Sequence, residues 1–99
     1  MNKLSSKQRA YIRALAHQLS PIVYIGKEGI TEQVIDSITK AFNRREVVKI
    51  KVLENAPETS SVSSKIISEK LEELNLVAVI GRIIIFYREH PQNPKVVLP

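Results

Sequence analysis

The chain has 99 residues, a formal net charge of +5 and an isoelectric point near 9.7. Hydrophobic residues make up 43% and charged residues 25%, which is typical of one small globular domain and not of a disordered chain. Cysteine is absent, which excludes disulfide bonds, thiolate metal ligands and a cysteine nucleophile, and points to the reducing cytoplasm. No apolar run approaches the roughly 18 residues that cross a bilayer, and residues 1–15 lack the apolar block of an export signal, so we expect neither a membrane anchor nor export.

The charge is distributed unevenly along the chain. The first 27 residues contain five basic side chains and no acidic one, whereas residues 28–99 contain ten of each. The whole excess therefore lies in the N-terminal segment, which indicates a polyanionic partner, most simply a nucleic acid. Charge alone is also compatible with a domain that merely has one basic end.

Residues 6–18 are predicted to form the first helix. Ser5 stands at the N-cap, and Gln8 three residues later completes a capping-box spacing, while Pro21 stops the helix. The apolar residues at helical spacing predict a buried face made of Ile12, Leu15, Ala16 and Leu19. A second face carries Arg9, Arg13 and His17 at intervals of four residues.

The remaining apolar patterns predict alternating strands and helices. Residues 22–25 are expected to form a buried strand, residues 32–43 a helix capped by Thr31, and residues 47–53 a second strand. The third helix starts at Thr59 or Ser60 and is expected to bury Val62, Ile66, Ile67, Leu71 and Leu74. Strands at residues 76–80 and 83–88 meet at Gly81-Arg82, which is a signal for a type II′ hairpin.

The order α-β-α-β-α-β-β predicts an α/β fold, a single compact domain with a four-stranded mixed sheet and helices. The strand–helix–strand units imply parallel crossovers, and the final hairpin adds an antiparallel strand. The pattern leaves open whether the helices cover one face of the sheet or both. Apolar residues 96–98 near the C-terminal end could dock against the domain.

The segment Gly26-Lys27-Glu28-Gly29 lies where a strand passes into a helix N-terminus. Its glycines allow positive φ angles and a close approach of a ligand to the backbone. The free N–H groups of the helix start can face an anion such as phosphate, and Lys27 adds a mobile positive charge. The spacing alone is equally compatible with an ordinary tight connection in which Glu28 opposes Lys27. The longer loop of a nucleotide-binding P-loop is missing.

Lys49 and Lys51 alternate with apolar residues, so both ammonium groups point to one face of a strand. They could form a positive rim for phosphates, or simply a solvated sheet face or an edge protected from aggregation. Tyr11 and Tyr24 could stack on bases, although core packing is the general expectation for the aromatic residues of this chain. Arg44 and Arg45 follow the second helix and complement its dipole.

The sequence offers little for catalysis. His17 and His90 lie in different elements, and no spacing of histidines or carboxylates suggests a metal site. His17 is better explained as a cap or packing residue than as a base. Helix-start chemistry accounts for the serines Ser60, Ser61, Ser63 and Ser64. We therefore expect no enzyme activity, no metal, no cofactor and no small-molecule substrate.

Three ordered blocks of the sequence resemble the CRM domain, a family named for chloroplast RNA splicing and ribosome maturation. The blocks are Leu15-Ala16-His17-x-Leu19-x-Pro21-Ile22-Val23-x-Ile25-Gly26-Lys27-x-Gly29-Ile30-Thr31, Val47-Val48-Lys49-Ile50-Lys51-Val52 and Val79-Ile80-Gly81-x-x-Ile84-Ile85-Phe86-Tyr87-Arg88. The resemblance covers essentially the whole chain, so residues 1–99 are expected to form one RNA-binding domain like that of the bacterial YhbY-type single-domain proteins.

The resemblance implies a fold similar to the C-terminal domain of bacterial translation initiation factor three. It also implies RNA binding on precursors of the large ribosomal subunit, with ribosomal RNA and ribosomal proteins as partners and a role in assembly. Its site residues fall on the loop Gly26, Lys27, Glu28 and Gly29, on Lys7, Arg9 and Arg13 of the first helix, and on the strand residues Lys49 and Lys51. The alternative is a protein-interaction module that docks on a ribosomal protein and has only incidental RNA affinity.

Overall fold

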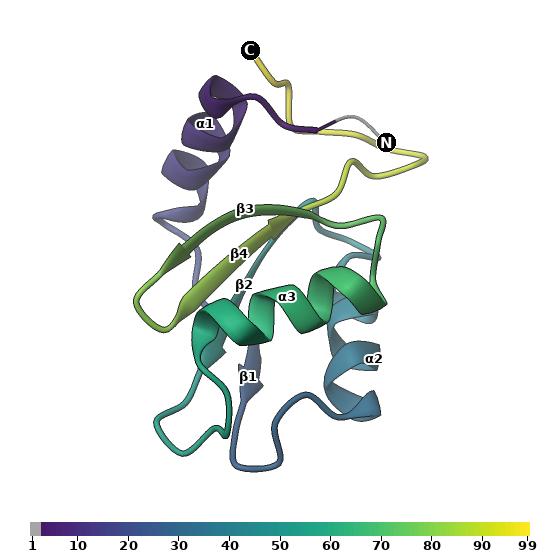
Figure 1. Ribbon diagram of the computed structural model, residues 1–99. Coiled ribbons are helices and arrows are strands. Elements are labelled where there is room, and N and C mark those ends of the chain that lie inside the picture. Colours follow the sequence, from purple (N-terminus) through teal and green to yellow (C-terminus); the bar gives the residue numbers. More distant parts are fainter. Residues whose placement is uncertain (1–2) are drawn as a thin grey trace.

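The helices and strands follow one another in the predicted order α-β-α-β-α-β-β (Figure 1). The computed structural model describes residues 3–99. Its elements are α1 (Ser6–Ala16), β1 (Val23–Ile25), α2 (Glu32–Ala41), β2 (Val47–Val52), α3 (Ser60–Lys70), β3 (Asn75–Ile80) and β4 (Ile83–Tyr87). These bounds confirm the predicted elements; α1, β1, α2, β2 and β4 are each one or two residues shorter than expected, and β3 begins one residue earlier, at Asn75.

The four strands form one mixed sheet in the order β1-β2-β4-β3. Strand β1 pairs with β2 in parallel, and β4 is antiparallel to both of its neighbours, β2 and β3. Gly81 turns the β3–β4 hairpin with φ of 58°, while Arg82 keeps a negative φ. Positive φ at only the first turn residue is what a type II′ turn requires, so the predicted hairpin is confirmed.

Helices cover both faces of the sheet, which answers the question that the sequence left open (Figure 1). Helices α2 and α3 lie on one face over a core that includes Ile25, Ile50 and Phe86. We call the opposite side the α1 face, because Ile12 and Ala16 of α1 pack there against Ile85 and other residues of the sheet. Val96 and Leu98 of the C-terminal tail (residues 89–99) pack on the same cluster, as expected for a docking tail.

Side-chain caps begin each of the three helices. The Ser5 hydroxyl accepts from the Gln8 N–H at 3.1 Å and the Gln8 side chain accepts from the Ser5 N–H at 3.0 Å, so the predicted capping box is confirmed. Thr31 and Thr59 cap α2 and α3, each by accepting a backbone N–H at 3.2 Å. Thr59, and not Ser60, is therefore the N-cap of the third helix.

Some predictions of burial were wrong on the α1 face. Leu15 and Leu19 are exposed, because α1 packs through the narrow stripe of Ile12 and Ala16 and ends before Leu19. Ile22 and Tyr24 are also exposed. Strand β1 is an edge strand whose α1 face is not covered by α1, so only the opposite side of the predicted buried strand is buried.

The inward face of α3 also differs from the prediction. Val62 is exposed, whereas Ser60, Ser63 and Ser64 are buried together with Ile67. Serine side chains of α3 are therefore buried where the larger Val62 was expected to be. Leu71 and Leu74, which follow the helix, are buried as predicted.

Candidate nucleic-acid interface

The loop from Gly26 to Gly29 is a tight turn between β1 and α2. The Gly29 N–H donates to the Gly26 carbonyl at 3.0 Å, and Gly29 has a φ of 72°. A Cβ at position 29 would also lie 3.0 Å from Cγ of Pro57, so both backbone conformation and packing require glycine there. Gly26 has no positive φ, and a Cβ there would meet only Leu53 Cδ1 at 3.9 Å. The fold thus explains the second glycine of the motif but not the first.

Three connections meet at the end of the sheet where this loop lies. The Leu53 N–H donates to the Ile25 carbonyl, and the Val52 N–H donates to the Arg82 carbonyl, each at 2.8 Å. The Gly26–Gly29 loop, residues 53–59 and the 81–82 turn are therefore neighbours. Lys27 and Arg82 are both exposed at this end. Arg82 is a candidate that sequence reasoning missed, because its position beside Gly81 was explained completely by the hairpin turn.

Acidic side chains share this end of the molecule. Glu28 and Glu54 are exposed, and Glu58 packs against Gly29, with its Oε1 atom 3.2 Å from the position of an added Cβ. A hollow of about 440 Å³ beside the loop is lined by Gly81, Arg82 and residues between 52 and 61 that include both Glu54 and Glu58. The loop end of the molecule thus carries both acidic and basic side chains. The positive potential that attracts a polyanion therefore lies mainly on the α1 face.

Lys49 and Lys51 lie on the α1 face, as predicted, but their ammonium groups differ. Lys49 Nζ donates to the carbonyls of Ala16 and Leu19, each at 3.0 Å, and so caps the C-terminal end of α1. Lys51 is exposed and stands beside Tyr24 of β1 in the sheet register. Strand β2 lies between β1 and β4, so the interpretation of these lysines as protection of a sheet edge was wrong.

A hollow lined by basic and aliphatic residues lies between helix α1 and the sheet, next to these strand residues. The hollow measures about 540 Å³ and is lined by Ala10, Arg13, Ala14, His17, Lys49, Ile80, Ile83 and Ile85. No acidic residue is among them. Ile83 is also the register partner of Lys51, and Tyr24 beyond it is 52% exposed. The structure therefore brings Arg13, Lys49 and Lys51 to one face, with an exposed aromatic ring at its border.

Lys7 and Arg9 lie apart from this cluster, in the first turns of α1. Both are exposed, and the Arg9 guanidinium donates to the Leu4 carbonyl at 2.9 Å and to the Ser6 hydroxyl at 3.3 Å. Figure 1 shows α1 and the loop after β1 toward opposite ends of the molecule. The basic residues of the first 27 positions therefore do not form one compact patch, although they are contiguous in the sequence.

Acidic and basic side chains are concentrated in different segments of the chain. The segments 28–41 and 54–74, which contain α2, α3 and their preceding loops, carry eight acidic and three basic side chains, whereas the rest of the chain carries twelve basic and two acidic ones. One of these two acids, Glu46, is 7% exposed and accepts the backbone N–H groups of His90, Lys95 and Val96 at 2.7 to 2.8 Å. Burial raises the pKa of Glu46, but the three N–H donors outweigh it and leave the pKa below the usual 4.5.

The two histidines lie in separate parts of the molecule, at the end of α1 and in the tail. His17 is the exposed C-cap residue of α1, in agreement with its predicted role as a cap. His90 packs in the tail, where Nε2 lies 2.9 Å from the Asn43 carbonyl and Nδ1 accepts from the N–H groups of Gln92 and Asn93. Among residues 3–99, no group of three or more His, Cys, Asp or Glu side chains is placed to hold a metal ion. No helix in the same range has the length and hydropathy of a membrane span.

Known proteins share this sequence and fold. A Bacillus subtilis protein named "Probable RNA-binding protein YqeI" is 34% identical over 97% of this chain and 99% of its own length. A Haemophilus influenzae protein named "RNA-binding protein" is 35% identical over all of this chain and 98% of its own. The solution structure of a hypothetical protein from Staphylococcus aureus superposes with a TM-score of 0.73 at 40% identity, covering 97% of this chain and 99% of that one.

The family assignment follows from the match along the domain itself. Residues 4–88 match the sequence profile of the CRS1 / YhbY (CRM) domain, a range that begins before α1 and ends after β4. The relatives are matched over almost their whole length as well. The chain belongs to the CRS1/YhbY (CRM) domain family.

Proposed function

We propose that this protein binds RNA through the α1 face and the adjoining Gly26–Gly29 loop. The observation that carries the proposal is the basic hollow on this face, which is lined by Arg13 and Lys49 and by no acidic residue, with Lys51 beside it. Among residues 3–99 the one ion pair joins Lys40 to Asp36 on α2, at 3.0 Å, so Arg13, Lys27 and Lys51 are available to phosphates. Two relatives that match this chain over almost their whole length are named as RNA-binding proteins, which supports the same function.

Each part of the surface has a separate role in this proposal. Lys27, Lys51 and Arg13 would neutralise backbone phosphates, and Gly26 would let a phosphate approach the main chain because no Cβ stands in the way. Tyr24 would stack on an unpaired base beside them. Lys7 and Arg9 would contact more distant phosphates, and Lys49 would contribute charge while it caps α1. Side chains do not read the narrow major groove of A-form RNA, so shape and exposed bases would determine preference.

The effect of salt on RNA affinity tests the role of Lys27. Lys27→Ala should weaken binding to deproteinised ribosomal RNA and reduce the slope of log K against log salt by roughly one, the value for one lost phosphate contact. Lys65→Ala is the matched control, because Lys65 is an exposed lysine of α3 on the other side of the sheet. Equal slopes for the wild type and Lys27→Ala in fluorescence anisotropy titrations would remove Lys27 from the interface.

We further propose that the RNA is ribosomal RNA in cytoplasmic precursors of the large subunit and that the protein assists their assembly without catalysis or a cofactor. The unit would be the whole chain, since Val96 and Leu98 beyond the family match pack on the same cluster as α1. Sedimentation of a cell lysate through a gradient tests this role. The protein should travel with particles lighter than the mature large subunit, and its absence from every ribosomal fraction would contradict an assembly role.

A further inference from the structure

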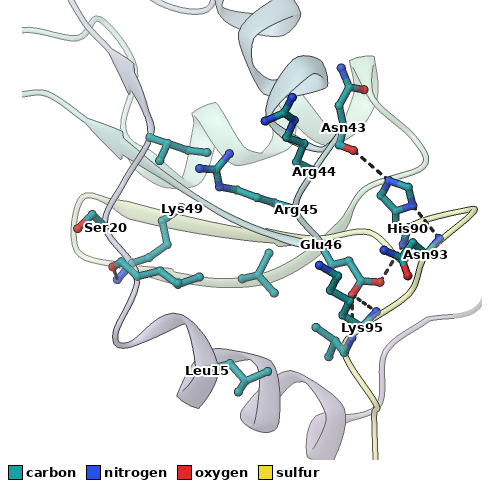
Figure 2. Close-up of a pocket in the computed structure, with 14 residues that line it drawn as sticks. Leu15, Ser20, Asn43, Arg44, Arg45, Glu46, Lys49, His90, Asn93 and Lys95 are labelled. Atoms are coloured by element: carbon teal, nitrogen blue, oxygen red, sulfur yellow. Dashed lines mark hydrogen bonds between the residues drawn. The ribbon is translucent and has the colours of Figure 1, made fainter.

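A groove lies at the end of the sheet where β2 begins, opposite the Gly26–Gly29 loop, and Figure 2 shows the residues that line it. It measures about 830 Å³ and is bordered by the chain that leaves α1, by residues 43–47 and by the tail. The lining residues on which the inference rests are Leu15, Leu19, Ile22, Arg44, Arg45 and Lys95. Strand β2 begins here at Val47, whereas the loop lies beyond its other end.

Exposed aliphatic side chains line one part of this groove. Leu15, Leu19 and Ile22 are 41%, 44% and 39% exposed, and all three line it. Three neighbouring large aliphatic residues, exposed in a domain that leaves few others exposed, indicate a contact surface. No Phe, Tyr or Trp lines the groove, and its single ring, the imidazole of His90, is held by hydrogen bonds to Asn43 and to the tail.

Cations line the rest of the groove. Arg44, Arg45 and Lys95 are exposed, and no ion pair within residues 3–99 engages them. Figure 2 shows Arg44 and Arg45 across the groove from Leu15 of α1, with Lys95 in the tail beside Glu46. The Glu46 carboxylate cannot neutralise them fully, because it is buried and committed to three backbone N–H donors. The groove thus combines free positive charge with aliphatic surface.

We propose that this groove binds a protein segment that carries both carboxylates and aliphatic side chains. The aliphatic residues of the segment would cover Leu15, Leu19 and Ile22, and its Asp or Glu side chains would pair with Arg44, Arg45 and Lys95. An RNA strand would satisfy the cations but would leave the aliphatic surface without a partner. This second binding site does not depend on the proposed RNA interface, because the groove and the Gly26–Gly29 loop lie at opposite ends of the sheet and, of the residues proposed to contact RNA, only Lys49 lines the groove.

Selection from a phage-displayed library of random dodecapeptides on the immobilised protein tests the inference. Enriched peptides should be rich in Asp or Glu together with Leu, Ile or Val. Synthetic copies should shift amide NMR signals of residues 15–22, 43–47 and 90–96 and leave those of residues 26–29 unchanged. Absence of enrichment, or enrichment of peptides without acidic residues, would overturn the proposal.

Variants separate the aliphatic from the ionic contribution. The double variants Leu15→Gln/Leu19→Gln and Arg44→Gln/Arg45→Gln should each weaken the selected peptides by about tenfold or more. The control double variant Val62→Gln/Lys65→Gln removes one aliphatic and one positively charged side chain at exposed positions of α3 and should have no effect. Circular dichroism confirms that each variant is folded. Unchanged peptide affinity in both double variants would contradict the assignment of the groove.

A single-stranded RNA dodecamer serves as the competing ligand. Its affinity should fall with Lys27→Ala and Lys51→Ala and stay unchanged in the Leu15→Gln/Leu19→Gln variant. If the leucine variant lowers RNA affinity while no acidic peptide is selected, the groove belongs to RNA and the inference is wrong. If the proposed RNA function is wrong, the wild type itself will not bind RNA, and this result is distinct from the outcome of the peptide selection.

Discussion

Lys49 and Lys51 stand two residues apart on the same face of β2, yet their ammonium groups have different surroundings. Lys49 is half-buried and donates to two carbonyls at the end of α1, whereas Lys51 is exposed. Alternation along a strand determines the face on which a side chain lies but not what covers that face. At the scale of single residues, one lysine therefore supports the fold and the other is free for a ligand.

The two lysines should respond oppositely to the same substitution. Lys49→Met is expected to lower the free energy of unfolding by about 1–2 kcal/mol, because the carbonyls of Ala16 and of Leu19, just beyond α1, lose a charged donor. Lys51→Met should stay within about 0.5 kcal/mol of the wild type but reduce RNA affinity and its salt slope. Urea unfolding and RNA titration of both variants check this. Equal losses of stability would contradict the helix-capping role of Lys49.

Tyr24 should contribute to RNA binding through its ring and not through its hydroxyl. Tyr24→Ala is expected to weaken binding to single-stranded RNA by about 1–3 kcal/mol, the range for one stacked base, whereas Tyr24→Phe should retain the affinity. Double-stranded RNA, which has no free base to stack, should distinguish the variants much less. Equal affinities of all three proteins for single-stranded RNA would exclude stacking at this position.

At the scale of elements, the Gly26–Gly29 loop depends on residues 53–59 for its shape. Gly29 lies against Pro57 and Glu58 with its backbone in the left-handed region, and Leu53 hydrogen-bonds the last residue of β1. The two glycines of the motif therefore have different reasons to be glycine. One is required by the fold, and the other leaves open a surface that a ligand can approach.

Alanine substitutions should separate these two reasons. Gly29→Ala is expected to cost about 1–2 kcal/mol in unfolding free energy for the left-handed conformation alone, with a further cost from the contact with Pro57. Gly26→Ala should change stability by no more than about 0.5 kcal/mol and yet weaken RNA binding, because its Cβ would keep a phosphate from the main chain. Unfolding in urea and RNA titration measure the two effects. Unchanged RNA affinity of Gly26→Ala would contradict close approach at this glycine.

The Glu46 carboxylate accepts three backbone N–H groups of the tail and so helps to hold it against the domain. Glu46→Gln should destabilise the protein by about 1–3 kcal/mol, because an amide nitrogen would replace one acceptor oxygen and leave a backbone N–H of the tail unpaired. Protection of the His90, Lys95 and Val96 amides from hydrogen exchange should fall in the same variant. Wild-type protection at all three amides would show that Glu46 does not hold the tail.

The stabilisation by Glu46 should depend on pH in a defined direction. Since the pKa of folded Glu46 is below the usual 4.5, its contribution is fully present above about pH 4.5 and is lost as pH falls through the lower folded value. The stability difference between the wild type and Glu46→Gln should therefore be largest near neutral pH and shrink as the pH falls below about 4.5. A difference that stays constant over this range would contradict the linkage.

At the scale of the whole molecule, periodicity predicted the order of the elements, because the residues that form them alternate between apolar and polar positions. It could not predict that Leu15, Leu19 and Tyr24 are exposed, since this depends on how much of the sheet a short helix covers. Of the candidate site, too, the sequence predicts only a part. Lys27 and Lys51 are exposed where expected, whereas Arg82 joins them only through the register of the hairpin, which brings its carbonyl to Val52.

The separation of charge across the sheet changes the meaning of the net charge. The molecule is about 24 Å across its shortest dimension, whereas charges are screened over roughly 8 Å at physiological ionic strength. A polyanion on the α1 face therefore interacts mainly with the basic side chains of that face and only weakly with the acidic side chains of α2 and α3 on the other side of the sheet. At about 0.01 M salt the screening length reaches roughly 30 Å, and both layers act together. The effective charge of this protein toward RNA is thus not a constant of +5 but a quantity that the surrounding salt sets.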